Sequence, residues 1–287
     1  MNQFGFEFNI AIAEIVLHVF SKKAIELEAG YVPFLVDKSK TADIEVECFQ
    51  GLPEVDFDGL KLLFEAKNDE QRFYSIYETS DGYCFLLFDQ QTKDEIQQIA
   101  YLNASFNYWK IHSRNAMALK YPMGPIIMHY LTLLIDAVLM HASCAFDGKN
   151  GRMFSGFSGA GKSTMSMIWA NAGSQIINDD RLVIRKMDGE FFVYNTPMYY
   201  VDISKKAPLS AIYLISHFPE NKAKKLSGAL AVSKVMAFCI QNNFDKSFIN
   251  KRLEFFSDLC SATPIYELGF VPNESVVTYI TENEKQG

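Results

Sequence analysis

"GFSGAGKSTM", residues 156–165, is the most informative stretch of this chain. It matches the pattern G-x-x-x-x-G-K-[ST] at every fixed position, from Gly156 to Lys162 and Ser163. A β-like run leads into the stretch, and a helical pattern follows it and closes at Gly173. A strand, a glycine-rich turn and a helix in this order predict a loop that binds phosphate groups. The plainer alternative is a glycine-rich turn before an ordinary helix.

The physical basis of this prediction lies in the backbone of the turn. Successive N–H groups would point into the loop, and the start of the helix would add the positive end of its dipole. Gly159 and Gly161 would let the backbone approach phosphate oxygens, because they carry no Cβ atom. Lys162 can bridge the β- and γ-phosphates, and the Ser163 hydroxyl can bind Mg²⁺. The predicted nucleotide-binding residues are Gly156, Phe157, Ser158, Gly159, Ala160, Gly161, Lys162, Ser163 and Thr164.

Two adjacent carboxylates follow the helix, in "IINDDRLVI" (176–184). A strand–helix–strand crossover this short should place its two strands parallel, with their carboxyl ends at one edge of the sheet. The loop would then lie at one strand end, and Asp179 and Asp180 at the other. Because side chains alternate along an extended chain, one aspartate can act on the substrate while the other holds a metal ion or Arg181. A solvated strand end is the alternative.

A histidine completes the predicted cluster. If residues 139–157 fold as a hairpin with its turn near residue 149, His141 lies opposite Phe157, to within about two residues. A histidine at this point can contact phosphate or orient an aspartate, and the alternative is a core histidine with satisfied hydrogen bonds. The other histidines have no such neighbours in the sequence and are interpreted as structural: His18, His112, His129 and His217.

Composition argues against other classes of function. The net charge is −7 and the isoelectric point is near 5.3, with no dense basic run, so we expect no nucleic-acid partner. The sharpest basic cluster, at Lys222, Lys224 and Lys225, is interpreted as a solvated loop. The most apolar run, residues 125–140, is too short and too polar to span a bilayer, and it predicts a buried helix that continues into a strand.

The cysteines and the N-terminal sequence both favour a cytoplasmic protein. The cysteines are scattered, odd in number and form no CxxC pair, which predicts small buried residues rather than disulfides or a structural zinc site. They are Cys48, Cys84, Cys144, Cys239 and Cys260. The N-terminal residues lack the basic segment and the small-residue cleavage site of a signal peptide. We therefore expect a cytoplasmic chain with no membrane partner.

The character of the sequence changes near residue 112. Residues 1–112 alternate short β-like runs with turn signals such as Asp81–Gly82, which predicts an antiparallel β-rich (α+β) region and a candidate for acceptor recognition. Residues 113–287 alternate helices and strands, which predicts an α/β domain that carries the glycine-rich loop. Pro122 and Pro125 are expected to interrupt its first helical stretch.

The segment from His141 to Ile184 resembles the catalytic core of HPr kinase/phosphorylase in the order and spacing of its histidine, its loop and its Asp-Asp-Arg sequence. It is more similar still to the smaller HPr-kinase-like proteins of peptide-modification gene clusters, which phosphorylate serine. The resemblance implies a P-loop kinase core of the HPr kinase and phosphoenolpyruvate carboxykinase type. It also implies that Asp179 is the general base, with Asp180 beside it, and that His141 is the active-site histidine.

We therefore expect an ATP-dependent phosphotransferase that acts on a seryl hydroxyl of a protein or peptide, with ATP and Mg²⁺ as cofactors. The expected catalytic residues are His141, Lys162, Asp179 and Asp180, and the expected metal ligands are Ser163 and Asp180. A non-catalytic ATP-binding maturation or sensor protein is one alternative, and a small-molecule kinase on the same fold is another. HPr kinases are hexamers, so the resemblance is compatible with an oligomer.

Overall fold

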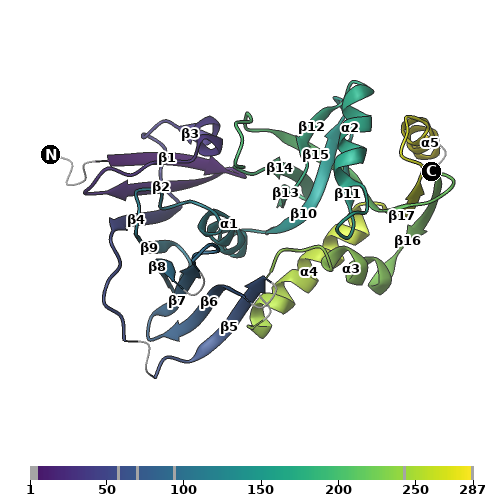
Figure 1. Ribbon diagram of the computed structural model, residues 1–287. Helices are drawn as coiled ribbons and strands as arrows, with labels where there is room; N and C mark the ends of the chain where they lie inside the picture. Colours follow the sequence, from purple (N-terminus) through teal and green to yellow (C-terminus); the bar gives the residue numbers. More distant parts are fainter. Residues whose placement is uncertain (1–5, 57–58, 69–70, 93–94, 242–243, 286–287) are drawn as a thin grey trace. The chain divides into compact units, whose positions relative to one another are not determined.

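The chain is a mixed α/β protein with two large sheets (Figure 1). The computed structural model describes residues 6–56, 59–68, 71–92, 95–241 and 244–285. It divides into two compact units, of which the first comprises residues 1–134 and 197–203 and the second residues 135–196 and 204–287. Each unit has its own sheet and its own core, so each is described separately.

A nine-stranded sheet in the order β3-β1-β2-β4-β9-β8-β7-β6-β5 forms most of the first unit. The pairs β2–β4 and β4–β9 are parallel, so the prediction of an antiparallel sheet is wrong for these two pairs. A parallel pair needs a long crossover connection, and the chain provides one by building β5 to β8 before it returns to β4. The elements are β1 (Phe6–Ile12), β2 (Ile15–Ser21), the 3₁₀ helix η1 (Ala29–Phe34), β3 (Leu35–Val36), β4 (Ile44–Gln50), β5 (Leu62–Asn68), β6 (Gln71–Thr79), β7 (Gly82–Phe88), β8 (Ile96–Asn103), β9 (Tyr108–Ser113) and α1 (Met123–Leu134).

Helix α1 belongs to the first unit, which therefore extends past the predicted boundary at residue 112. Its Tyr130 packs against the sheet, with ring centroids 5.2 Å from Phe85 and 5.8 Å from Trp109. Pro125 lies inside this helix and does not interrupt it, because the first turn of a helix needs no intrahelical N–H donor. Only two residues separate the end of this helix from the start of β10, so the predicted passage from buried helix to strand is confirmed.

The second unit contains an eight-stranded sheet, and helices α2 to α5 pack against it. Strands β10 and β15 organise the sheet, because each pairs with three others: β10 with β11, β12 and β13, and β15 with β11, β14 and β17. The elements are β10 (Ala137–Phe146), β11 (Gly151–Ser155), α2 (Lys162–Asn171), β12 (Gln175–Asn178), β13 (Arg181–Met187), β14 (Glu190–Asn195), β15 (Lys206–His217), β16 (Lys222–Leu226), α3 (Gly228–Met236), α4 (Lys246–Ala262), β17 (Ile265–Phe270) and α5 (Ser275–Glu284).

Two clusters of apolar side chains form the core of the second unit. Helices α2 and α5 cover one cluster, which includes Phe154, Trp169 and Phe270. Helices α3 and α4 contribute to the other cluster, which includes Phe256 and Leu259. Burial of this apolar surface holds the strands in register. The strand ends, and the loops that follow them, are therefore held in fixed positions.

Three predictions from the sequence can be compared with the structures of the two units. The basic cluster at Lys222, Lys224 and Lys225 is not a loop, because it lies in β16, which pairs antiparallel with β17. All the cysteines are free; three are buried and two are half-buried. Among the described residues, no helix has the length and apolar character needed to cross a bilayer.

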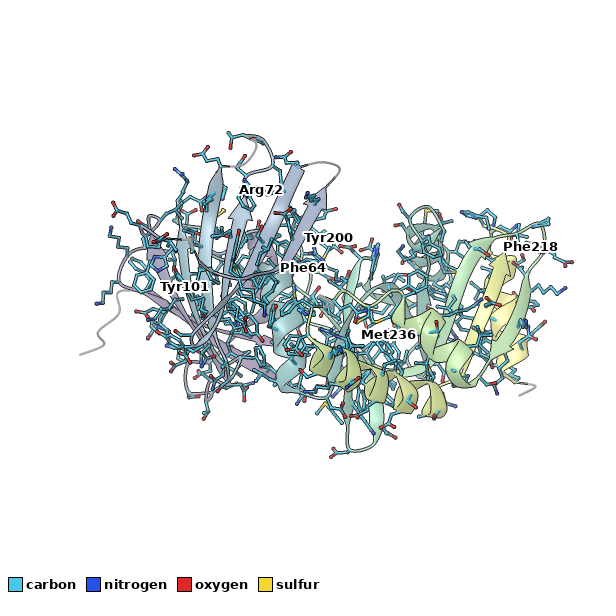
Figure 2. The ribbon with its side chains drawn as sticks, turned by 90° about the horizontal axis from the view of Figure 1, so that it is seen from below. Phe64, Arg72, Tyr101, Tyr200, Phe218 and Met236 are labelled. Atoms are coloured by element: carbon cyan, nitrogen blue, oxygen red, sulfur yellow. The ribbon has the colours of Figure 1, made fainter. Side chains whose placement is uncertain are left out.

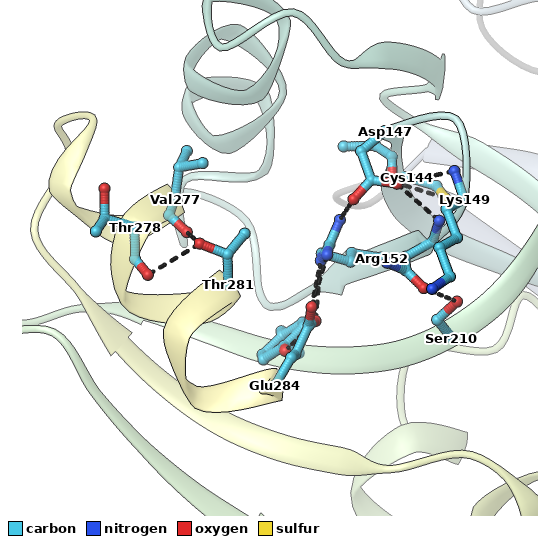
Figure 3. Close-up of polar contacts among 12 residues, drawn as sticks. Cys144, Asp147, Lys149, Arg152, Ser210, Val277, Thr278, Thr281 and Glu284 are labelled. Carbon is cyan, nitrogen blue, oxygen red and sulfur yellow. Dashed lines mark hydrogen bonds and ion pairs between the residues drawn. The ribbon is translucent and has the colours of Figure 1, made fainter. Parts of the chain in front are cut away.

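A buried arginine ties the C-terminal helix α5 to the sheet (Figure 3). Arg152 is 2% exposed and donates to the Glu284 carboxylate at 2.6–3.1 Å and to the Asp147 carboxylate at 2.7 Å. Its guanidinium also lies over the Trp169 ring, 4.8 Å from the centroid. Burial raises the pKa of Asp147, but hydrogen bonds from the Asn150 amide and from Arg152 outweigh it and lower this pKa to about 2.

Replacement of this arginine should destabilise the second unit. Arg152→Met leaves two carboxylates without their cation, and breaking a buried ion pair in this way costs about 3–5 kcal/mol of unfolding free energy. Urea denaturation followed by far-UV circular dichroism measures the loss. Lys186→Met is the matched control, because its 2.7 Å pair with Asp258 is more exposed and should contribute far less to stability. Equal losses in the two variants would contradict this assignment.

Candidate functional site

The glycine-rich loop connects β11 to α2 in the second unit. Gly159 and Gly161 adopt positive φ angles of 79° and 98°, which the backbone of other residues rarely adopts. Gly161 is also tightly packed, since a Cβ atom there would lie 2.7 Å from Cζ of Phe270 and 3.0 Å from Cε1 of His217. Both the backbone angle and the lack of space therefore require glycine at this position.

The N-terminus of α2 opens directly from this left-handed turn. Gly161 is the N-cap residue and has no side chain that could accept hydrogen bonds from the first amides of the helix. The Met165 amide donates to the Gly161 carbonyl at 2.8 Å. The amides of Lys162, Ser163 and Thr164 come before this donor, in the first turn of the helix, where amides have no carbonyl partner within the helix. Helix N-termini of this kind attract anions through their N–H groups and their dipole. The geometry thus suits a phosphate group.

The Lys162 ammonium lies at the loop itself. Its Nζ donates to the Gly156 carbonyl at 2.9 Å and to the Phe157 carbonyl at 3.4 Å. Burial lowers the pKa of Lys162, and the charge of Asp180 opposes this effect. Carbonyl oxygens are weaker partners for an ammonium group than phosphate oxygens are, because hydrogen bonds between two charged groups are the stronger ones. An incoming phosphate can therefore compete for this ammonium.

Strand pairing brings the loop and the aspartates to one edge of the sheet. β11 and β12 both pair antiparallel with β10, so they run parallel to each other, as the sequence predicts (Figure 1). The loop follows the carboxyl end of β11, and Asp179 and Asp180 follow the carboxyl end of β12. Open α/β sheets bind their ligands at this edge.

His141 lies on β10 at the same edge, one residue away from the predicted register. The pairs Ala142↔Ser155 and Ser143↔Phe154 extend the hairpin so that His141 falls opposite Gly156 rather than Phe157. The Ser155 hydroxyl donates to the His141 carbonyl at 2.9 Å and fixes this end of the hairpin. The difference lies within the margin of the prediction.

A short chain of polar contacts connects His141 with the Asp-Asp-Arg sequence. Nε2 of His141 is 3.4 Å from Oδ1 of Asp180, and Nε of Arg181 is 3.2 Å from Oδ2 of the same carboxylate. Burial lowers the pKa of His141, and the charges of Lys162 and Arg181 lower it further, whereas Asp180 raises it. The net effect lowers the pKa of His141, which favours the neutral form of its imidazole.

Asn178 is a site residue that sequence reasoning missed. Its Oδ1 accepts hydrogen bonds from the Asp179 amide at 2.7 Å and from the Asp180 amide at 3.0 Å. Asn178 itself is 2% exposed, and its Nδ2 donates to the Thr196 carbonyl at 3.5 Å. An asparagine that caps the following amides is a known turn signal, so "NDD" at the end of a strand could have indicated this role.

His217, which the sequence indicates to be structural, lies beside the glycine-rich loop. It lies at the end of β15 and is exposed, and its ring is tilted against that of Phe270, with ring centroids 5.1 Å apart. Its ring also borders Gly161, because a Cβ atom at that glycine would lie 3.0 Å from Cε1 of His217. No local pattern indicates this neighbour, because β15 begins more than forty residues after the loop ends.

The comparisons with known proteins add little to this geometry. No protein-family model matches the chain, and no curated protein matches it in sequence. A solved structure, that of the Hpr(Ser) kinase/phosphatase from Coxiella burnetii, matches with a TM-score of 0.33 and 10% sequence identity. The alignment covers 52% of this chain and 96% of that chain. At this TM-score the likeness carries no argument about activity, which therefore depends on the residues of the site.

The charge environment of His141 can be tested by NMR titration. We expect its imidazole to titrate below 6.5, with a lower pKa still in Asp180→Asn, because the aspartate charge raises it. Lys162→Met should raise the pKa of His141, because it removes a neighbouring positive charge. Asp188→Asn, in the turn between β13 and β14, serves as the control and should change nothing. A rise in Asp180→Asn would show that the charges around His141 are assigned wrongly.

Proposed function

We propose that the second unit binds Mg²⁺–ATP and transfers its terminal phosphoryl group to a seryl hydroxyl of a protein or peptide. The observation that carries this proposal is the shared sheet edge, which holds the glycine-rich loop, Lys162, His141 and the two aspartates. The sequence resemblance of residues 141–184 to HPr-kinase-like proteins supports a serine acceptor.

Phosphate binding in this proposal uses the loop and the start of α2. The amides from Gly159 to Thr164 bind the phosphate oxygens, and Lys162 releases its loop carbonyls to contact the β- and γ-phosphates. Phosphoryl transfer is mostly a matter of positioning and charge stabilisation, so a small set of fixed donors can be sufficient.

Ser163 and Asp180 are suited to hold the magnesium ion. Mg²⁺ is usually bound by one or two protein oxygens together with substrate phosphates, and no cluster of three or more acidic or metal-binding side chains occurs among the described residues. The Asp180 carboxylate is 41% exposed and its two ionic neighbours lie at 3.2–3.4 Å, which leaves it capacity for a cation. When bound, the ion would neutralise charge on the phosphates.

Asp179 is the proposed general base. The serine oxygen bonds to the terminal phosphorus, the bond from that phosphorus to the bridging oxygen breaks, and the hydroxyl proton passes to the Asp179 carboxylate. Asn178 holds the backbone of this residue in place through its amide. His141 contacts one carboxylate oxygen of Asp180 and Arg181 contacts the other. Both are therefore positioning residues for that carboxylate.

Removal of the loop ammonium should weaken nucleotide binding. Lys162→Met is expected to reduce the affinity for Mg²⁺–ATP by at least about tenfold, because hydrogen bonds to charged groups contribute roughly 1.5–3 kcal/mol. Isothermal titration calorimetry measures the change. Lys149→Met is the matched control, because Lys149 is exposed in the turn at the far end of the same hairpin. Equal affinities in wild type and Lys162→Met would contradict the proposed phosphate site.

Asp179→Asn should separate binding from transfer. We expect Mg²⁺–ATP affinity to stay within about twofold, while phosphoserine formation on an array of serine peptides falls about 10²- to 10⁴-fold, the usual contribution of a general base. Asp188→Asn, in an exposed turn, is the control and should transfer normally. Unchanged transfer in Asp179→Asn would refute the base assignment. ATP binding by the wild type without any transfer would favour a binding protein instead.

A further inference from the structure

A hollow of about 590 Å³ opens beside the first residues of the glycine-rich loop. Gly156 and Phe157 form one wall, and the ends of β15 and β17, together with β16 and α3, form the others. All of the lining residues belong to the second unit. Its volume lies within the range of small-molecule sites, which is about 300–1,000 Å³.

The hollow lies on the opposite side of the loop from the aspartates. The strands at this edge follow in the order β12, β10, β11, β15 and β17, and β15 and β17 run parallel to β11. Asp179 and Asp180 follow β12 at one end of this row, and the hollow is lined by the carboxyl ends of β15 and β17 at the other. A ligand whose phosphates fill the loop can therefore present one end to the aspartates and the other to the hollow.

Aromatic side chains give the hollow its character. Phe157 is 77% exposed, although it belongs to the loop itself, and its ring meets Phe238 edge to face at 5.2 Å. Phe218, which is labelled in Figure 2 at the end of β15, is 47% exposed and lines the same hollow. Exposed aromatic rings beside a phosphate site are suited to stack on the flat faces of a nucleobase.

The charges around the hollow suit the same kind of ligand. Lys222 and Lys224 lie two residues apart on β16, so they point to the same face, and both line the hollow. Lys234 of α3 is paired with Glu267 of β17, also at the wall. The excess of ammonium groups favours a ligand that carries phosphate, and the carboxylate offers an acceptor for hydroxyl or amine hydrogens.

We infer that this hollow holds the base and ribose of the nucleoside triphosphate whose phosphates occupy the loop. The inference rests on the proposed function. The terminal phosphate must face Asp179 for transfer, so the nucleoside end leaves the loop on the other side, where Phe157, Phe218 and the lysines of β16 lie.

Calorimetry with two ligands tests this inference. The wild type should bind Mg²⁺–ATP at least about tenfold more tightly than Mg²⁺–tripolyphosphate, because stacking of a base on aromatic rings contributes that much or more. Phe218→Ala should weaken ATP binding by about fivefold or more and leave tripolyphosphate binding unchanged. Phe6→Ala, which removes a ring of similar exposure from β1 of the first unit, is the matched control.

The outcomes separate this inference from the proposed function. Equal affinities for ATP and tripolyphosphate in the wild type would overturn the base site while leaving the phosphate site intact. A Phe218→Ala variant with normal ATP affinity but a raised KM for the acceptor peptide would also overturn it, because the hollow would then bind the acceptor. Failure of the wild type to bind either ligand would refute the phosphate site, and the inference with it.

Discussion

The antiparallel pairing of β10 with β11 on one side and β12 on the other is the constraint on which the candidate site depends. This pairing makes β11 and β12 parallel, so their carboxyl ends emerge at one edge of the sheet. The glycine-rich loop and the Asp179–Asp180 pair follow those two ends, and His141 lies on β10 between them. Without β10 in this position, the same residues would remain in the sequence but would not form a site.

Compensation of charge holds the residues of this edge in place. Asp180 is contacted by His141 and Arg181. Burial lowers the pKa of Lys162, and the charge of Asp180 partly opposes this lowering. Such a network is held together by opposite charges that lie a few ångströms apart in a partly buried site. The Lys162 ammonium donates to the loop carbonyls of Gly156 and Phe157. An arriving polyphosphate would thus meet donors that are already positioned.

Local features of this site could be predicted from the sequence, and non-local ones could not. The loop, the start of α2 and the parallel relation of β11 and β12 follow from short-range patterns, and the register at His141 differs from its prediction by one residue. The contacts of His217 and Phe270 with Gly161 depend on strands that return from far along the chain. The parallel pairs that β4 forms with β2 and β9 also join strands that are not neighbours in the sequence. A prediction based on consecutive hairpins therefore misses them.

The most direct test of the central claim is an NMR titration of the ¹⁵N-labelled protein with Mg²⁺ and inorganic tripolyphosphate, which has no base to contribute. If the backbone of the loop is the phosphate site, the largest amide shifts will fall on the residues from Gly159 to Thr164, and Lys162→Met will reduce them. Shifts that are absent at saturating ligand, or that concentrate elsewhere in the chain, would contradict the account.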